Sequence, residues 1–301
     1  MSNTISDEIW TRLSCPQCSG PVEITNKAVS CQLCNTTFPA LPNGGVDLRL
    51  QLPRQCQSVV TIEPSPLYPR LSFEPLKSAK PLDKEKRLSR LPPRISTELA
   101  ARFPKATGKT ALMLDLGCGK MIHRELVEHQ GFRYVGLDRD DPGAMFLGDA
   151  QALPFTDGSF EFVLSISVLQ EVPHPEMMIR EAFRVLTPGG VFIGSAAYLE
   201  SYSRTYHHFT HLGLNALLQQ EGFAVEAIAP NPRWTAPISL LGNGLFPYMP
   251  RPLAVALVSP VYVGHRIWWW LGGFLHPQAT ESNRLLLTTG SFFFIARKPI
   301  V

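Results

Sequence analysis

The stretch that decides the fold spans residues 111–120 and reads Ala-Leu-Met-Leu-Asp-Leu-Gly-Cys-Gly-Lys. An apolar run ends in Asp115, and Gly117 and Gly119 follow before helix-forming residues resume at 121–130. This order predicts a buried strand over 110–115, a tight turn and the start of a helix. Glycine lets the backbone turn sharply and approach a ligand closely, and the free N–H groups of a helix start favour a carboxylate or phosphate. We therefore expect this loop to cradle a ligand.

A second acid indicates which kind of ligand. A strand-like run, 132–137, ends in Asp138, 23 residues after Asp115, where a strand-end carboxylate accepts the hydroxyls of a ribose. A lone Gly-x-Gly is also compatible with an ordinary strand-to-helix turn. A dinucleotide fold would use a third glycine near Lys120-Met121-Ile122 to admit a pyrophosphate. The loop therefore favours a nucleoside cofactor that has no pyrophosphate.

Further blocks follow in order at 135–138, 149–155, 168–173 and 181–190. With 114–119 they give the sequence a resemblance to the class I S-adenosylmethionine-dependent methyltransferases, in particular the broad type 11 group, over about residues 110–229 and again at the C-terminal end. The resemblance implies a Rossmann-like α/β fold with a mostly parallel seven-stranded sheet, helices on both faces and S-adenosyl-L-methionine as cofactor. Gly117 and Gly119 would then pass its methionine part, Asp138 would hold the ribose, and Asp149 with Ala150 would face the adenine. The implied cofactor-binding residues are Asp115, Gly117, Cys118, Gly119, Asp138, Asp149, Ala150 and Ser167.

The sequence departs from that family in two places. Many members have a glycine where Met121 stands. Only residues 139–143 separate Asp138 from the short apolar run 144–147, too few for the usual helix between the second and third strands at about 1.5 Å of rise per residue. We therefore expect an unusually open adenine pocket.

Four of the six cysteines form two Cys-x-x-Cys pairs with twelve residues between them. Such pairs each present two sulfurs to one metal, so Cys15, Cys18, Cys31 and Cys34 predict a structural Zn²⁺ site in a zinc ribbon over 1–50. Disulfides and a thioredoxin-like redox pair are the alternatives, the first disfavoured in a reducing cytoplasm. This module resembles the small zinc-binding activator of tRNA and protein methyltransferases and the ribbon of rRNA guanine-N1 methyltransferases. Cys118 is interpreted as a small filler rather than a nucleophile.

Composition limits the remaining possibilities. The net charge of +3 is too small to imply a nucleic-acid partner by itself, and no secretory signal is evident, so we expect a cytoplasmic protein. Residues 51–94 are rich in proline and in Lys and Arg, which predicts an extended linker. Alternating helical and apolar segments then predict a parallel sheet covered by helices, with a helix over 175–187 and a strand over 191–197. By the resemblance, residues 95–301 form the methyltransferase domain, and 291–297 would be its last strand, which in the family runs antiparallel to its neighbours.

An apolar insertion at 230–290 sets this chain apart. A membrane span needs about 20 uninterrupted apolar residues, and Pro260, His265 and Arg266 interrupt the longest candidate. The insertion, especially 236–275, is therefore interpreted as a peripheral contact with the inner membrane face, a lid over an apolar substrate, or part of the core.

The acceptor of the methyl group is less well defined by the sequence. His207 or His208 could serve as a general base, because the unperturbed pKa of histidine is about 6.5. The leading hypothesis is an enzyme that methylates a small-molecule or lipid-like substrate. An rRNA or tRNA base methyltransferase and a non-catalytic scaffold are the alternatives.

Overall fold

The structure, a computed structural model, describes residues 5–25, 28–50, 91–199, 205–231, 245–275 and 281–300. Most of the predicted linker, residues 51–90, and residues 232–244 of the insertion lie outside these ranges.

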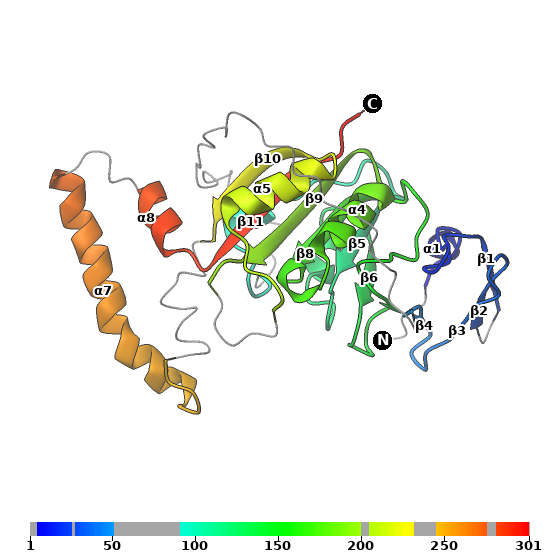
Figure 1. The fold of residues 1–301 in the computed structure, drawn as a ribbon, viewed down its shortest axis with the longest axis horizontal. Coiled ribbons are helices and arrows are strands. Elements are labelled where there is room, and N and C mark those ends of the chain that lie inside the picture. Colours follow the sequence, from blue (N-terminus) through cyan, green and yellow to red (C-terminus); the bar gives the residue numbers. More distant parts are fainter. Residues whose placement is uncertain are drawn as a thin grey trace.

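A single eight-stranded sheet organises the chain, in the order β10-β11-β9-β8-β5-β6-β7-β4 (Figure 1). The strands are β4 (Val46–Asp47), β5 (Leu112–Leu116), β6 (Arg133–Asp138), β7 (Phe146–Leu147), β8 (Phe160–Ile166), β9 (Leu186–Ala197), β10 (Ala224–Pro230) and β11 (Ser291–Arg297). Only β11 runs antiparallel to its neighbours β9 and β10. The predicted fold class is confirmed. The sheet has one strand more than the seven predicted, because β4 joins its edge.

The central strands are buried on both faces, as their continuous apolar runs predict. Every residue of β5 is buried, and so is every residue of β8 except Glu161. Phe146, Phe155 and Phe160 continue the core in edge-to-face contacts with centroid separations of 5.7 and 5.0 Å. The strand ends that carry the predicted site are therefore fixed by a rigid core.

The helices of the domain are shorter than predicted. They are α2 (Thr97–Ala100), α3 (Arg124–Glu128), α4 (Pro175–Val185) and α5 (His211–Gln220), and α4 and α5 lie on one face of the sheet (Figure 1). The predicted helix over 175–187 ends at Val185, because Leu186 is extended, with ψ of 140°, and pairs with Phe160. The strand predicted over 191–197 begins earlier, at Leu186, so that Pro188, Gly189 and Gly190 lie inside β9.

The N-terminal module is joined to the sheet edge. It comprises α1 (Asp7–Trp10) and a three-stranded sheet of β1 (Val22–Ile24), β2 (Ala28–Cys31) and β3 (Thr37–Pro39). Its β4 then pairs in parallel with β7. The Asn43 side-chain amide donates hydrogen bonds of 2.9 and 3.0 Å to the carbonyls of Pro142 and Ala144, so β4 and Asn43 contact the turn that has no room for the usual helix.

A long helix, α7 (Arg251–Leu275), and the shorter α8 (Glu281–Thr288) precede the last strand. Figure 1 shows α7 at the end of the molecule opposite the N-terminal module. Within the described residues, no helix combines the length and the hydropathy that crossing a membrane requires.

Candidate functional site

A cleft of about 290 Å³ opens at the carboxyl ends of β5, β6 and β8. Five of the cofactor-binding residues that the resemblance implied line this cleft: Gly117, Asp138, Asp149, Ala150 and Ser167. Ligands of open α/β sheets bind at this edge. The other three do not line the cleft: Asp115 lies within β5, and Cys118 and Gly119 lie in the loop that follows it.

The glycine loop adopts a conformation that other residues reach at a cost. Gly117 and Gly119 have φ of +69° and +48°, in the left-handed region that favours glycine. A Cβ at Gly117 would lie 2.3 Å from Cγ2 of Val168, whereas a Cβ at Gly119 would meet nothing within 4 Å. Met121 has φ of +54°, in the same left-handed region. This backbone conformation explains why many family members have glycine at this position.

Asp138 fastens this loop to the end of β6. Its Oδ2 accepts a hydrogen bond of 2.8 Å from the Gly119 N–H, and its Oδ1 accepts bonds of 2.9 Å from the N–H groups of Asp140 and Asp141. Each carboxylate oxygen can accept about two hydrogen bonds. Asp138 therefore shapes the loop and keeps acceptor capacity at the cleft.

A buried polar cluster beneath the loop escaped the sequence analysis. Oδ2 of Asp115 accepts a 2.6 Å hydrogen bond from the Tyr134 hydroxyl and lies 3.0 Å from Nδ1 of His123. Among the described residues, the other carboxylate oxygen of Asp115 and Nε2 of His123 are buried with no hydrogen-bond partner. A buried polar atom without a partner costs about 1–3 kcal/mol, so this cluster is suited to a ligand with complementary polar groups.

A short chain of hydrogen bonds holds the segment that follows β7. The carboxylate of Asp149 accepts hydrogen bonds from the backbone and side-chain amides of Gln151, at 2.8 and 3.0 Å. The side-chain carbonyl of Gln151 in turn accepts a 2.9 Å bond from the N–H of His174, the residue before α4. Asp149 and Ala150 are thereby tied to α4.

Arg94 is a second residue that sequence reasoning missed. It lines the cleft and has φ of +68°. A non-glycine residue in this region stores strain and recurs at ligand sites. The signal in the sequence is a cation directly after Pro92-Pro93, but this position falls within the predicted linker, residues 51–94.

The structure separates the two histidines that were candidates for a general base. Nε2 of His207 lies 2.9 Å from the carbonyl of Pro173, which lines the cleft. Because a carbonyl only accepts, Nε2 carries the proton and Nδ1 of neutral His207 holds the lone pair. His208 is exposed and lies 3.4 Å from the Thr205 hydroxyl. Neither histidine lines the cleft, and Tyr202 of the same loop lies outside the described residues.

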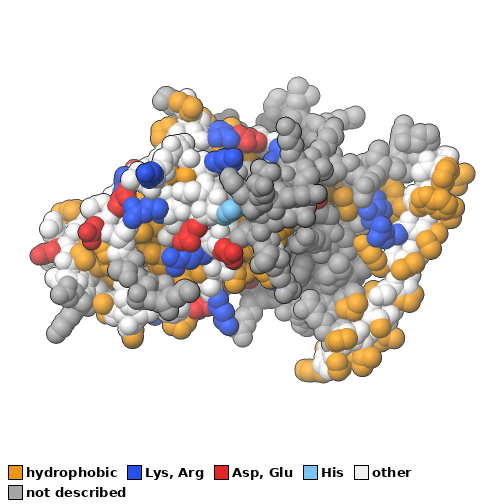
Figure 2. Space-filling model, turned by 180° about the vertical axis from the view of Figure 1, so that it is seen from behind, with side chains coloured by type: hydrophobic (Ala, Val, Ile, Leu, Met, Phe, Trp, Pro, Cys, Tyr) orange, Lys and Arg blue, Asp and Glu red, His pale blue; other side chains and the backbone are white. Residues whose placement is uncertain are grey.

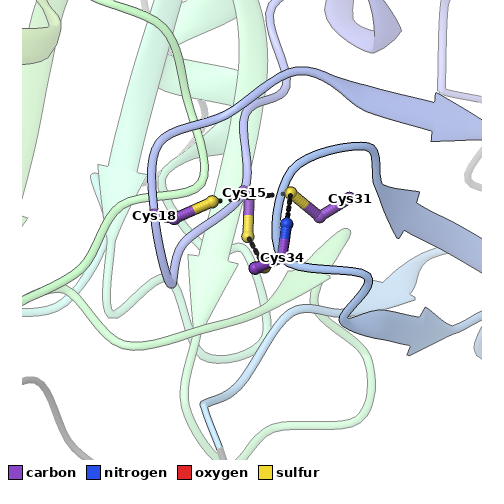
Figure 3. A group of neighbouring side chains, drawn as sticks. All are labelled: Cys15, Cys18, Cys31 and Cys34. Atoms are coloured by element: carbon purple, nitrogen blue, oxygen red, sulfur yellow. Dashed lines mark hydrogen bonds between the residues drawn. The ribbon is translucent and has the colours of Figure 1, made fainter.

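The four cysteines of the N-terminal module converge from two knuckles (Figure 3). All four sulfurs lie within 4.8 Å of one another, with Cys15 and Cys34 at 3.6 Å and Cys18 and Cys31 at 3.5 Å. Tetrahedral zinc with Zn–S bonds of about 2.3 Å separates its sulfurs by roughly 3.8 Å, and a disulfide needs about 2.05 Å. The cluster is therefore compatible with zinc.

The thiols of this cluster differ in their tendency to ionise. Burial raises the pKa of the Cys15 thiol to about 12, whereas hydrogen bonds from Thr36 lower the pKa of Cys34 to about 6. Were all four ionised, thiolates this close would repel one another unless a dication compensated them. Burial also raises the pKa of the Cys118 thiol, which leaves little of the nucleophilic thiolate at neutral pH.

Comparison with known proteins identifies the domain that carries the cleft. Residues 114–194 match the family described as "Methyltransferase domain". This part of the chain is similar to S-adenosylmethionine-dependent methyltransferases. An uncharacterized methyltransferase of Mycobacterium tuberculosis is 27% identical over 64% of this chain and 80% of its own. The 27-O-demethylrifamycin SV methyltransferase of Amycolatopsis mediterranei is 31% identical over 32% of this chain and 42% of its own.

The similarity to solved structures is lower. Phosphoethanolamine N-methyltransferase 2 of Haemonchus contortus, in complex with S-adenosyl-L-methionine, is 18% identical, with a TM-score of 0.41 over 64% of this chain and 50% of its own. The first curated relatives are matched over 42–55% of their own length. The chain thus spans about half the length of these relatives.

Proposed function

We propose that the protein transfers a methyl group from S-adenosyl-L-methionine to a small apolar or lipid-like acceptor. The observation that carries the proposal is the glycine loop fastened to Asp138 at the adjoining ends of β5 and β6. A carboxylate there can accept ribose hydroxyls beyond the three backbone N–H groups that it already binds. Asp149 and Ala150, at the end of the next strand, would then face the adenine.

Two features bear on the methionine end of the same assignment. The buried Asp115–His123 pair lies beneath the glycine loop and does not line the cleft, so it would support that loop rather than contact the cofactor. Arg94, which lines the cleft, is a cation suited to the methionine carboxylate.

The composition of the cleft does not suit a polyanionic acceptor. Ile166, Val168, Val172 and Pro173 make its wall after β8 apolar. The charged lining has four carboxylates (Asp138, Asp140, Asp149 and Glu171) against two guanidinium groups (Arg94 and Arg139). An RNA-binding surface needs the opposite balance, because phosphate contacts supply most of its affinity.

The chemistry asks little of the protein beyond alignment and exclusion of water. S-adenosyl-L-methionine supplies the methyl group on a sulfonium, which is already activated. An acceptor that attacks through a hydroxyl would lose its proton as its oxygen takes the methyl group and the methyl–sulfur bond of the cofactor breaks. We assign this proton to Nδ1 of His207, since Nε2 is fixed by Pro173.

Two measurements test the proposal. Titration calorimetry of S-adenosyl-L-methionine compares Asp138→Asn with Asp157→Asn, an exposed aspartate outside the cleft. We expect the first to raise the dissociation constant by about tenfold or more and the second to leave it unchanged. Radiolabelled methyl transfer into cell extract, separated into organic-soluble, RNA and protein fractions, should then place the label in the organic phase.

Each other outcome overturns a defined part. Label in RNA refutes the apolar acceptor and makes the N-terminal module the substrate platform. Wild-type protein that does not bind S-adenosyl-L-methionine refutes the enzyme and supports a scaffold. An unchanged dissociation constant in Asp138→Asn removes the ribose assignment alone.

A further inference from the structure

Helix α7 exposes more apolar surface than any other described element. It has 25 residues, which gives a length of about 37 Å at roughly 1.5 Å per residue. Trp268, Trp270, Phe274 and Leu275 are 65–73% exposed. Its other exposed large apolar residues are Leu253, Val255, Leu257, Val261, Val263, Ile267 and Leu271. Figure 2 shows hydrophobic side chains along the whole of this helix.

One narrow side of α7, its inner side, is less exposed than the rest. Ala254 and Val258 are buried there, and Tyr262 and His265 are half-buried. Arg266 is exposed beside the inner side, and its guanidinium lies 6.0 Å from the centroid of the Tyr262 ring. Burial, with the charge of Arg284 on α8, lowers the pKa of His265.

The exposed apolar residues cover far more of the helix than this inner side does. At about 100° per residue they extend over roughly two-thirds of the circumference. A partner helix covers a narrow seam of positions repeating every 3.5 residues or so. An apolar medium that surrounds the outer side of the helix fits this distribution better than one protein surface.

The charge of the segment indicates which medium. Residues 227–280 contain no Asp or Glu, although the chain has 25, and they include Arg233, Arg251 and Arg266. Helices that lie in a membrane interface combine apolar faces containing tryptophan with cations that meet anionic headgroups. Pro260, His265 and Arg266 interrupt the apolar run near the middle of the helix, which suits a helix lying along a membrane rather than across it.

We propose that α7 docks the protein on a bilayer containing anionic lipids. The helix lies along the surface and inserts its outer side into the boundary between headgroups and acyl chains, while the inner side with Ala254 and Val258 faces away from the bilayer and the exposed Arg266 can reach the headgroups. This docking extends beyond the proposed methyl transfer, and its test measures binding rather than activity.

The test is flotation of the full chain with vesicles of phosphatidylglycerol and phosphatidylcholine, compared with phosphatidylcholine alone. Trp270→Glu/Phe274→Glu changes two exposed α7 residues in mutual edge contact. Leu212→Glu/Ile300→Glu is the matched control, because both residues are exposed elsewhere and the charge change is the same. We expect the α7 variant to lower the partition coefficient by about tenfold or more, the control to retain wild-type binding, and both to keep the wild-type melting temperature.

Three results overturn the proposal. Wild-type protein that does not float with the anionic vesicles refutes it, as does equal binding of the α7 variant and the control. A concentration-dependent dimer in sedimentation equilibrium that Trp270→Glu/Phe274→Glu dissolves, without vesicle binding by the wild type, assigns α7 to a second copy of the chain instead.

Discussion

The two glycines of the cofactor loop offer a matched pair of substitutions. Both have left-handed φ, so alanine at either position costs about 1–2 kcal/mol of backbone strain. Only at Gly117 does the new Cβ overlap a side chain, at 2.3 Å from Cγ2 of Val168, and relief of such overlap costs about 1–3 kcal/mol more. We therefore expect Gly117→Ala to lower the free energy of unfolding by about 2–5 kcal/mol and Gly119→Ala by about 1–2 kcal/mol.

A double-mutant cycle isolates the overlap. Val168→Ala removes the atom that the new Cβ meets, so Gly117→Ala/Val168→Ala should be more stable than the sum of the single variants by about 1–3 kcal/mol. Equilibrium urea unfolding of the four proteins measures the free energies. Equal destabilisation by Gly117→Ala and Gly119→Ala, or a coupling energy of zero, would refute the close approach of this loop to Val168.

Three further predictions follow from the site and the zinc module. Met121→Val should be less stable to urea than Met121→Gly by about 1–2 kcal/mol, because a β-branched residue is disfavoured at positive φ; equal stabilities would contradict the conformation of Met121. Purified protein should contain one zinc ion per chain by mass spectrometry, and Cys15→Ser should lose it together with protection of β1–β3 from hydrogen exchange. Cys118 should resist iodoacetamide at pH 8.5 until the chain is unfolded, since a raised pKa depletes the reactive thiolate; modification of the folded protein would show that the thiol is accessible and ionised.

The sequence predicted the parts of the fold that rest on local patterns. Strands buried on both faces are continuous apolar runs, so β5, β6 and β8 were recognisable along with the antiparallel β11. The pairing of β4 with β7 was not, because Val46 and Asp47 form a two-residue strand whose partner lies about a hundred positions away. Its position depends on tertiary contacts such as Asn43 with Ala144.

The same distinction applies to the cleft. Asp138 and the glycines stand in a recognisable order along the chain, whereas His123 and Arg94 acquire a role only through folding. His123 matters because the turn before α3 brings it to Asp115, and Arg94 because its unusual φ accompanies a place at the cleft. Neither residue type is distinctive in isolation.

The β4–β7 pairing has a thermodynamic consequence for the metal and the cofactor. The N–H of Leu48 donates to the carbonyl of Leu147, and Gly148, Asp149 and Ala150 of the cleft follow at once. A ligand that orders these residues also orders the edge on which the cysteine module rests. Because coupling between two sites is reciprocal in binding free energy, saturation of the cleft should tighten the equilibrium binding of zinc by the same free energy by which zinc tightens binding in the cleft. Metal content would then set the affinity of the cleft from a distance.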